Sequence, residues 1–447
     1  MIQLIKAIST VLTLLDGTAV PQDGPMTIDQ AISAAEANAF VVRIQSTVVE
    51  KNRQKLNEAR VSLGPMITLG ANYTRYDQEI TTSFGKGAAP IVIQPIDTKT
   101  VTGTVTLPID ISGNKTRLVN ASKATKLASE FTLKGSYNDT RLSVRQAYFS
   151  VLRSKAQIAV DEKALADAKG RLDQGQKQFA QQQVAKLDVT RYQAQVAQSN
   201  ADLISAKDAL TLANYAFNLA LARPIESSVN LVDVTELPAL DTPEEALVAT
   251  GQSMRPEVLA ANQNLRALAL ITRATESGMN PSLTFQLNQN RTIDPQGLTS
   301  SSETTTGSLI LSVPIFDSGV TRARVKEARQ DQTQAKITLE QTKLQISQEV
   351  RNAVANLSSA KARLDNAIEQ VRLAEEVFRL AKVRQDAGAG TYYEVIDSES
   401  QLTLARNGEV SARYDYLTSY SQLQRAVGAD DVATAAAKVS RAPMGGK

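Results

Sequence analysis

The chain has 447 residues, more than one ordinary globular core holds, which indicates several domains or an internal repeat. It contains no Cys and no His, so disulfides, thiol nucleophiles and the commonest metal ligand and general base are excluded. The formal net charge of +3 is nearly balanced and predicts no nucleic-acid partner. No cofactor is expected.

The N-terminal segment, residues 1–25, has only some features of a signal peptide. The apolar run Ala7–Leu15 follows Lys6, but Asp16 comes directly after it and no A-x-A-like cleavage site is clear. We therefore expect an N-terminal segment or the remnant of a signal. The chain has no run of about 18 apolar residues, so no transmembrane helix is expected.

The first half of the chain, residues 26–223, begins with a helix and two strands. Thr27 is a residue type that caps helices, and Gly64-Pro65 marks the end of this helix. In residues 66–80 and 99–111, apolar side chains alternate with Thr, Gly and Asn. This alternation predicts two β-strands, each with one apolar face and one small polar face.

A long helical hairpin is predicted next, over residues 113–222. Its return helix is about half as long as its outgoing helix. We expect the helix at 242–277 to stack end to end on the return helix, and the N-terminal helix to stack on 393–427. Residues 224–241 then form an equatorial linker. Apolar residues recur at every seventh position of the outgoing helix, which is typical of a supercoil with a defined seam: Val144, Val151, Ile158, Leu165, Leu172 and Phe179.

The second half, residues 242–428, repeats the first. Leu107–Gly113 matches Val313–Gly319 at an offset of 206 residues. The repeat predicts a helix, strands at 282–293 and 304–316, a helical hairpin at 319–427, and a C-terminal equatorial segment and tail at 429–447. Its seam combines a large apolar series with an all-alanine series: Val350, Leu357, Leu364, Val371 and Phe378, with Ala353, Ala360, Ala367, Ala374 and Ala381.

The four strands together predict a membrane wall. Their threonine-rich face cannot be a globular core, and their apolar face is typical of a lipid-facing barrel. Because every backbone group must be paired in lipid, an open sheet of four strands must close by oligomerising, and three chains give twelve strands. The polar loops 77–98 and 290–304 would lie outside the cell. The alternative is an ordinary half-exposed sheet with its apolar face on the helices.

The predicted fold is therefore mainly α, with a four-stranded antiparallel β contribution per chain. In this fold a trimeric α-barrel of long coiled-coil helices is continuous with a 12-stranded transmembrane β-barrel.

Acidic residues lie at the tips of the two hairpins. Glu394 and Asp397 are three positions apart and share one helix face, and Asp188 is the counterpart of Glu394 in the first repeat. If the tips converge on a three-fold axis, these carboxylates form a ring that favours cations over anions. The alternative is a set of solvated carboxylates on a helical surface.

The arrangement resembles the TolC family of outer-membrane efflux and secretion channels over about residues 26–428. The most specific similarity lies in Gly390–Asp397 and in Ala412–Leu417. The resemblance implies a homotrimer in outer-membrane lipid of a Gram-negative bacterium, spanning into the periplasm. It implies a periplasmic adaptor (membrane fusion) protein and an inner-membrane transporter as partners. It also implies a periplasmic gate and selectivity ring at Glu394 and Asp397.

The resemblance also implies that the tip surfaces of the hairpins, residues 181–188 and 387–393, contact the adaptor. In better-known relatives the tip is latched through an Arg just after the Gly-Thr pair, but the residue at that position here is Tyr392, so this latch must differ. Lys186 near Asp188 could substitute for it. The expected contact residues are Val184, Ala185, Lys186, Gly388, Gly390, Thr391 and Tyr392.

The predicted function is an outer-membrane exit duct of a tripartite efflux pump or type I secretion system. It would passively conduct substrates from an inner-membrane transporter to the exterior, and no enzyme activity is expected. The alternative is a periplasmic adaptor or structural coiled-coil protein without a pore. Two hairpins and paired alternating strands argue against an adaptor, which usually has one hairpin flanked by β-rich domains.

Overall fold

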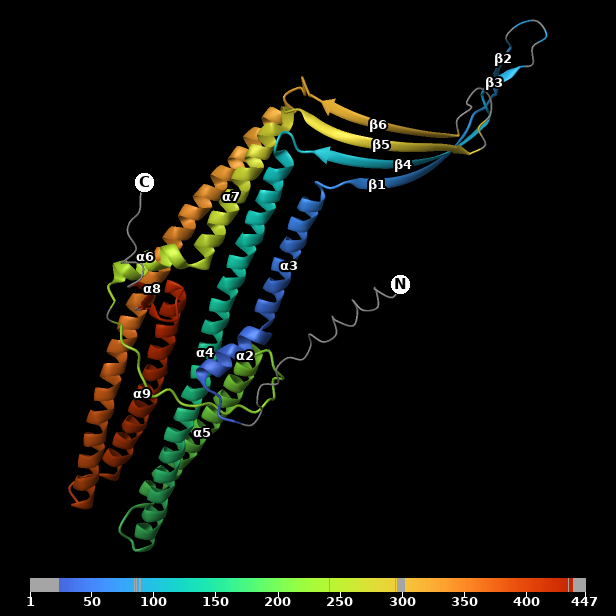
Figure 1. Ribbon diagram of the computed structural model, residues 1–447. Helices are drawn as coiled ribbons and strands as arrows, with labels where there is room; N and C mark the ends of the chain where they lie inside the picture. Colours follow the sequence, from blue (N-terminus) through green and yellow to red (C-terminus); the bar gives the residue numbers. More distant parts are fainter. Residues whose placement is uncertain are drawn as a thin grey trace. The chain divides into compact units, whose positions relative to one another are not determined.

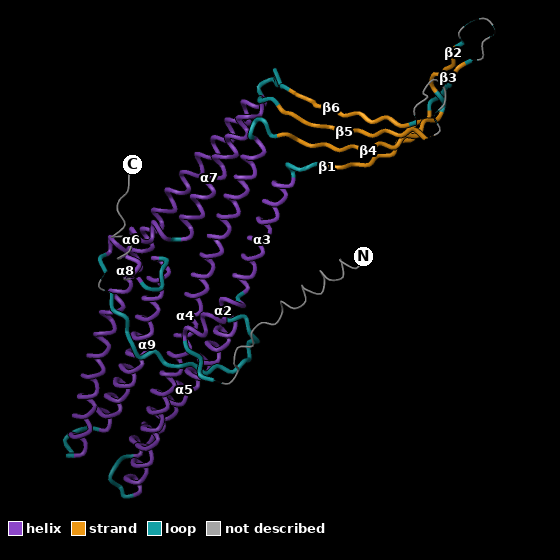
Figure 2. Tube along the Cα trace, in the orientation of Figure 1, coloured by secondary structure: helices purple, strands orange, loops and turns teal. Residues whose placement is uncertain are grey.

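The computed structural model describes residues 24–83, 85, 87, 90–240, 242–293, 295, 302–432 and 434–436 (Figures 1 and 2). The predicted signal remnant before residue 24 and the predicted tail after residue 436 lie outside this part. The chain divides into two compact units, and each unit takes segments from both halves of the sequence. One comprises Met1–Thr47, Phe131–Leu259 and Gln341–Lys447, and the other comprises Val48–Glu130 and Ala260–Glu340.

The second unit contains an antiparallel sheet of four strands in the order β1-β4-β5-β6 (Figure 2). These strands are β1 (Met66–Arg75), β4 (Asp97–Ile109), β5 (Ser282–Ile293) and β6 (Glu303–Ser312). The two halves of the chain therefore join through β4 and β5. The predicted strand 304–316 ends early, at Ser312, because Ser312 pairs with Ser282, the first residue of the neighbouring strand β5.

The alternation of side chains along these strands gives the sheet two different faces. Thr68, Thr104, Asn288 and Thr306 lie in one cross-strand row, and the Thr104 hydroxyl donates to Asn288 Oδ1 at 2.9 Å. The opposite face is apolar and uncovered, with Leu69 81% exposed. The predicted division into a small polar face and an apolar face is confirmed.

The loop predicted between β1 and β4 contains a second, smaller sheet. Strands β2 (Ile80–Thr82) and β3 (Ile91–Gln94) pair antiparallel with a shift in register. The prediction of a loop throughout 77–98 is therefore wrong. Its physical reason is local, because residues 91–93 are the β-branched run Ile-Val-Ile, which favours extended backbone.

Helices α3 (Phe40–Val61), α4 (Asn114–Ala180), α7 (Pro256–Glu276) and α8 (Val320–Asp386) contribute residues to this unit, as does the short 3-10 helix η2 (Ser277–Met279). Aspartates cap the two helices that follow the strands. Asp110 accepts from the Thr116 amide at 2.8 Å, and Asp317 accepts from the Thr321 amide at 2.6 Å. None of the helices in the described part of the chain is both long and apolar enough to cross a membrane.

The first unit contains two long helical hairpins, α4 with α5 (Lys186–Ala220) and α8 with α9 (Tyr392–Val427). The predicted seam is buried along much of its length. Val144 and Val350 are 0% exposed, and Ala360 is also 0% exposed. Toward the tip the burial weakens, since Phe179 is 44% exposed.

The helices that flank the hairpins are each broken once. The predicted N-terminal helix forms α2 (Ile28–Asn38) and α3, separated at Ala39, and Thr27 caps α2 with Gln30 as its capping-box partner. The predicted helix 242–277 forms α6 (Glu244–Met254) and α7. The break falls at Arg255, whose backbone is extended because Pro256 follows it.

The predicted end-to-end stacking is wrong in its pairing. Met26 and Ile32, before and within α2, share a buried cluster with Phe217 and Leu221 at the end of α5. The α6–α7 break instead lies on the end of α9, where a Cβ on Gly428 would come within 3.1 Å of Arg255 Cγ. The heptad spacing predicted the lengths of the helices. It contains no information on which helix ends pack against each other.

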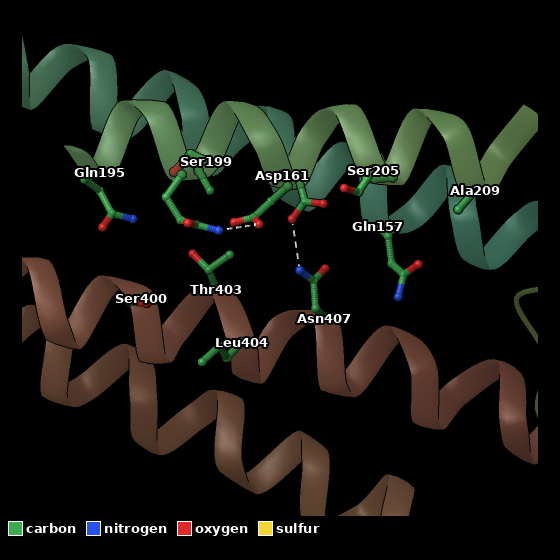
Figure 3. Close-up of a pocket in the computed structure, with 14 residues that line it drawn as sticks. Gln157, Asp161, Gln195, Ser199, Ser205, Ala209, Ser400, Thr403, Leu404 and Asn407 are labelled. Carbon is green, nitrogen blue, oxygen red and sulfur yellow. Dashed lines mark hydrogen bonds between the residues drawn. The ribbon is translucent and has the colours of Figure 1, made fainter. Parts of the chain in front are cut away.

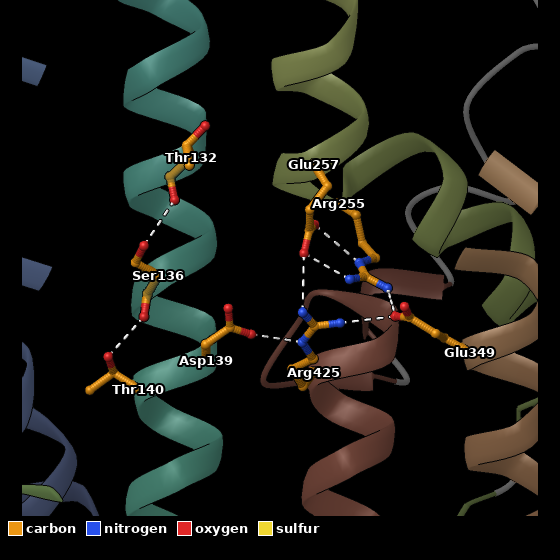
Figure 4. Close-up of polar contacts among 8 residues, drawn as sticks. All are labelled: Thr132, Ser136, Asp139, Thr140, Arg255, Glu257, Glu349 and Arg425. Carbon is orange, nitrogen blue, oxygen red and sulfur yellow. Dashed lines mark hydrogen bonds and ion pairs between the residues drawn. The ribbon is translucent and has the colours of Figure 1, made fainter. Parts of the chain in front are cut away.

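An ion-pair network holds the junction of α7, α8 and α9 (Figure 4). Arg255 is 2% exposed and pairs with Glu257 and Glu349. Arg425 pairs with the same two carboxylates and with Asp139 of α4 at 2.8 Å. Because two guanidinium groups share two carboxylates, each charge at this junction keeps a partner.

Gly428 ends α9 in the left-handed region with φ +80°. We expect Gly428→Ala to lower the free energy of unfolding by about 1 kcal/mol, because a Cβ is strained at this φ and would press on Arg255. Gly408→Ala is the matched control, since Gly408 lies inside α9 with open space around it. Urea unfolding followed by circular dichroism should show the first substitution destabilising and the second neutral or stabilising. Equal effects would contradict the assignment.

Candidate functional site

The tip of the first hairpin is a short turn between Ala180 and Lys186. Gln182 adopts φ 59°, and the Gln183 amide donates to the Gln178 carbonyl at 2.9 Å. Asp188 begins α5 by accepting from the Ala185 amide at 3.3 Å. Its charged neighbour is Arg191 at 3.9 Å, so the expected pairing of Lys186 with Asp188 is not formed.

The tip of the second hairpin is built by glycine and a threonine cap. Gly388 adopts φ +71°, which a glycine takes without strain. Thr391 caps α9, and its hydroxyl accepts from the Glu394 amide at 3.2 Å. Arg384 donates to the Ala389 carbonyl at 3.3 Å and lies 3.9 Å from the Glu394 carboxylate.

The predicted acidic residues lie on both hairpins and do not form one group within a single chain. Glu394 and Asp397 lie on the first turns of α9, where Asp397 is exposed and forms no ion pair with any described residue. Asp188 lies on the other hairpin, with its side chain 21% exposed. The described residues contain no group of three or more acidic side chains placed to hold a metal. A ring of carboxylates therefore requires further copies of the chain.

An aromatic cluster that the sequence did not reveal joins the two hairpins just inside their tips. The rings of Tyr192 on α5 and Tyr392 on α9 meet edge to face at 6.0 Å. The Tyr392 hydroxyl donates to Gln178 Oε1 of α4 at 3.1 Å, and the Gln385 side chain hydrogen-bonds Tyr192. Burial, followed by the nearby Tyr392, raises the pKa of Tyr192 to about 12. We call Gly175, Gln178, Tyr192, Gln385 and Tyr392 the tip cluster.

Gly175 makes room for this cluster. A Cβ at Gly175 would lie 2.7 Å from Cδ2 of Tyr192, closer than real contacts allow. The sequence held one weak signal for this, because an isolated glycine inside a helical pattern often marks a close approach. Nothing in the sequence identified Tyr192 as its neighbour.

The outer surface of the tips is partly apolar. Tyr393 is 61% exposed and Leu187 is 59% exposed, and the Arg191 guanidinium lies 5.9 Å from the Tyr393 ring. Exposed aromatic and aliphatic side chains beside an arginine are typical of protein contacts. Leu187 and Tyr393 lie inside the tip surfaces 181–188 and 387–393 at which the adaptor is expected to dock, and Arg191 lies three residues beyond the first of them.

A buried ion pair lies deeper in the interface between the hairpins. Arg171 on α4 pairs with Glu399 on α9, and their side chains are only 18% and 8% exposed. The guanidinium also lies 5.4 Å from the centre of the Phe378 ring on α8. Burial lowers the pKa of Arg171 below its usual value. Together with the Phe378 contact, this ion pair connects α4, α8 and α9.

A polar cavity of about 630 Å³ lies between the first hairpin and α9 (Figure 3). Asp161 is 6% exposed and accepts from Asn407 Nδ2 at 2.9 Å, and Gln198 donates to Asp202 at 2.8 Å. No lysine or arginine lines the cavity. The hairpins therefore contact each other through hydrogen bonds here, instead of through a continuous apolar core.

Comparison with known proteins identifies the family. The sequence profile of the family described as "Outer membrane efflux protein" matches residues 31–223 and 249–429. The chain belongs to the outer membrane efflux protein family. It is an outer-membrane protein, and the predicted resemblance to TolC-type channels is confirmed.

Two curated proteins are similar to this chain over much of their length. The cobalt-zinc-cadmium resistance protein CzcC of Cupriavidus metallidurans is 24% identical over 392 residues, covering 86% of this chain and 85% of CzcC. The outer membrane protein TolC of Vibrio cholerae is 27% identical over 294 residues, covering 64% and 67%. A solved structure of CusC matches with a TM-score of 0.76 at 19% identity over 90% of this chain and 92% of CusC, which shows a shared fold.

Proposed function

We propose that three copies of this chain form one exit duct through the outer membrane. The supporting observation is the open sheet, in which the described part of β1 and of β6 each pairs with a single neighbour strand. Its apolar face is uncovered, with Ile67 76% exposed. In lipid the two open edges must be paired, and three sheets of four strands close into a barrel wide enough for a polar lumen.

The hairpins support the same assembly. Exposed apolar side chains on α5 include Ile204 at 53% and Leu212 at 67%, and those on α8 include Leu344 at 71% and Val377 at 56%. Such stripes on a coiled-coil helix favour packing against another helix. Contacts between α5 of one copy and α8 of the next would close a helical barrel.

The duct conducts passively, with its energy supplied by partners. The family is one of outer-membrane efflux proteins, so we propose no enzyme activity for this chain. A periplasmic adaptor would dock at the tips, near Val184, Ala185, Lys186, Gly388, Gly390, Thr391 and Tyr392, and an inner-membrane transporter would deliver the cargo. An efflux pump and a type I secretion system both use this arrangement. Membership of the efflux family favours a duct over an adaptor.

The decisive experiment is to extract the full chain from outer membranes in detergent and measure its mass and its conductance. Three subunits per particle and ion-conducting events in planar bilayers are expected. A monomer or dimer that stays soluble without detergent would contradict the proposal and favour the adaptor alternative.

We expect the double substitution Glu394→Ala with Asp397→Ala to reduce cation selectivity and to leave the trimer intact. Three copies would remove six carboxylates from a narrow neck, and fixed charge there sets the local concentration of ions. Reversal potentials under a salt gradient measure the change. Glu50→Ala with Glu58→Ala on α3 removes the same charge away from the tips and should leave the potential unchanged. An unaltered potential in the tip variant rules out the acidic neck.

A further inference from the structure

The charged residues of the four-stranded sheet all lie on its apolar face. The strands contain five of them, Arg75, Asp97, Lys99, Arg291 and Glu303. The register places them on the same face as Ile67 and Leu69. They lie in the rows nearest the two loops that connect β1 to β4 and β5 to β6. The opposite face carries only uncharged side chains within the four strands, mostly Thr, Ser, Asn and Gln.

Three cations form a diagonal line across three neighbouring strands. Tyr73 of β1 is opposite Lys99 of β4, and Val101 of β4 is opposite Arg291 of β5. Arg75 and Lys99 are therefore diagonal neighbours, as are Lys99 and Arg291. Diagonal neighbours in an antiparallel sheet lie roughly 7–8 Å apart, within reach of one ligand for side chains of this length. We call Arg75, Lys99 and Arg291 the rim cations.

The two acidic residues on this face neutralise the rim only in part. Asp97 is opposite Arg75 and accepts from the Tyr73 hydroxyl at 2.7 Å. Glu303 lies 3.5 Å from Arg291, but both side chains are more than half exposed, so this pair contributes little. Arg75 and Lys99 form no ion pair with any described residue. Within the described part of the chain the central position, Lys99, therefore has no ion-pair partner.

The rim borders an apolar belt. Ile67 and Val105 lie in one row with Leu287, and Leu107, Phe285 and Leu309 lie in another. Tyr73, 57% exposed, lies between these rows and the loops. An apolar belt that ends in an aromatic residue and cations is the pattern of a surface that meets acyl chains first and head groups next.

We propose that the rim cations bind the phosphate groups of a phosphorylated glycolipid in the outer leaflet, with its acyl chains along the apolar rows. The proposal rests on the membrane-spanning sheet proposed above. Guanidinium groups bind phosphate oxygens in a bidentate manner, and an ammonium group binds them as a point charge. A line of three cations suits a head group with more than one phosphate. The site takes a lipid because the apolar rows continue directly from it.

The test uses the full-length protein purified in detergent and incubated with diphosphorylated lipid A. Native mass spectrometry counts the bound lipid per particle and reports the subunit number in the same spectrum. We expect the triple variant Arg75→Gln, Lys99→Gln, Arg291→Gln to bind at least tenfold less lipid than the natural chain. The single variant Lys99→Gln should show an intermediate loss and guards against misfolding of the triple variant.

Two controls make the outcome specific. Lys51→Gln, Lys55→Gln and Arg60→Gln remove three exposed cations from α3 and should bind lipid like the natural chain. Dephosphorylated lipid A should bind the natural chain as weakly as diphosphorylated lipid A binds the triple variant. The head-group site is ruled out if the natural chain binds the two lipids equally. It is also ruled out if the α3 variant loses as much lipid binding as the triple variant. Failure of the exit-duct proposal would appear separately, as particles without three subunits or without conductance.

Discussion

Replacing Glu399 by Leu is expected to lower the free energy of unfolding by about 3 kcal/mol, the largest effect expected of any single substitution considered for this protein. The substitution leaves the Arg171 guanidinium without its carboxylate in an interface where that side chain is only 18% exposed. A buried charge without a partner costs far more than the net contribution of the pair itself. Urea unfolding of the purified protein in detergent, followed by circular dichroism, measures the change.

The double variant Arg171→Met with Glu399→Leu distinguishes the destabilisation caused by an unpaired buried charge from the destabilisation caused by lost packing. It removes both charges, fills similar volume and should recover most of the stability, within about 1 kcal/mol of the natural chain. Asp415→Leu is the matched control. Asp415 pairs with Arg153 across the same two helices, but these side chains are 49% and 40% exposed, so its loss should cost less than about 1 kcal/mol. If the double variant is no more stable than Glu399→Leu alone, the buried-charge explanation fails.

The features that could be predicted are those set by local pattern. Two seven-residue series identified the buried seam, one with Val144 and Val151 in the first repeat and one with Val350 in the second, and each of these residues is fully buried. Alternation identified the strands, and Thr27 had the chemistry of a cap. In each case the deciding physics acts within a few residues, so the sequence carries it directly.

The features that could not be predicted depend on which surfaces meet. Tyr192 and Tyr392 are 200 positions apart in the sequence, and no repeated spacing of residues links them. The stacking of α2 on α5 follows from a cluster around Phe217, which the helix lengths did not specify. The acidic residues could be singled out because their residue type and their position in the family motif are visible in the sequence, and their role stays a prediction. The tip cluster was missed because tyrosine and glutamine have no comparable pattern.

The tip cluster bears on how the tips are held closed, because Tyr392 occupies the position that the family resemblance assigns to a latch arginine. At the tips, the described residues join the two hairpins by the edge-to-face contact of Tyr192 with Tyr392 and by two hydrogen bonds, Tyr392 to Gln178 and Gln385 to Tyr192, instead of by an ion pair. Such a link is less sensitive to salt than a pair of exposed charges. We therefore expect the conductance of the closed duct to change little with the screening of charges at the tips.

Tyr392→Ala is expected to open the tips. It removes an edge-to-face contact of about 1 kcal/mol and a hydrogen bond of about 1 kcal/mol, so the ratio of open to closed forms should rise about 30-fold. Tyr392→Phe keeps the ring and loses only the bond to Gln178, so it should produce a smaller rise. Gly175→Ala should act like Tyr392→Ala, because its Cβ displaces the Tyr192 ring. The fraction of time spent in the high-conductance state in planar bilayers measures the ratio.

Lys186→Ala is the matched control for this prediction. Lys186 lies at the tip of the first hairpin, is exposed, and makes no side-chain ion pair with any described residue. It should therefore leave the open fraction unchanged, although it removes a charge close to the proposed gate. An effect of Lys186→Ala equal to that of Tyr392→Ala would mean that charge at the tip controls opening. A closed, unaltered channel in both Gly175→Ala and Tyr392→Ala would mean that contacts between copies, and not the tip cluster, hold the hairpins together.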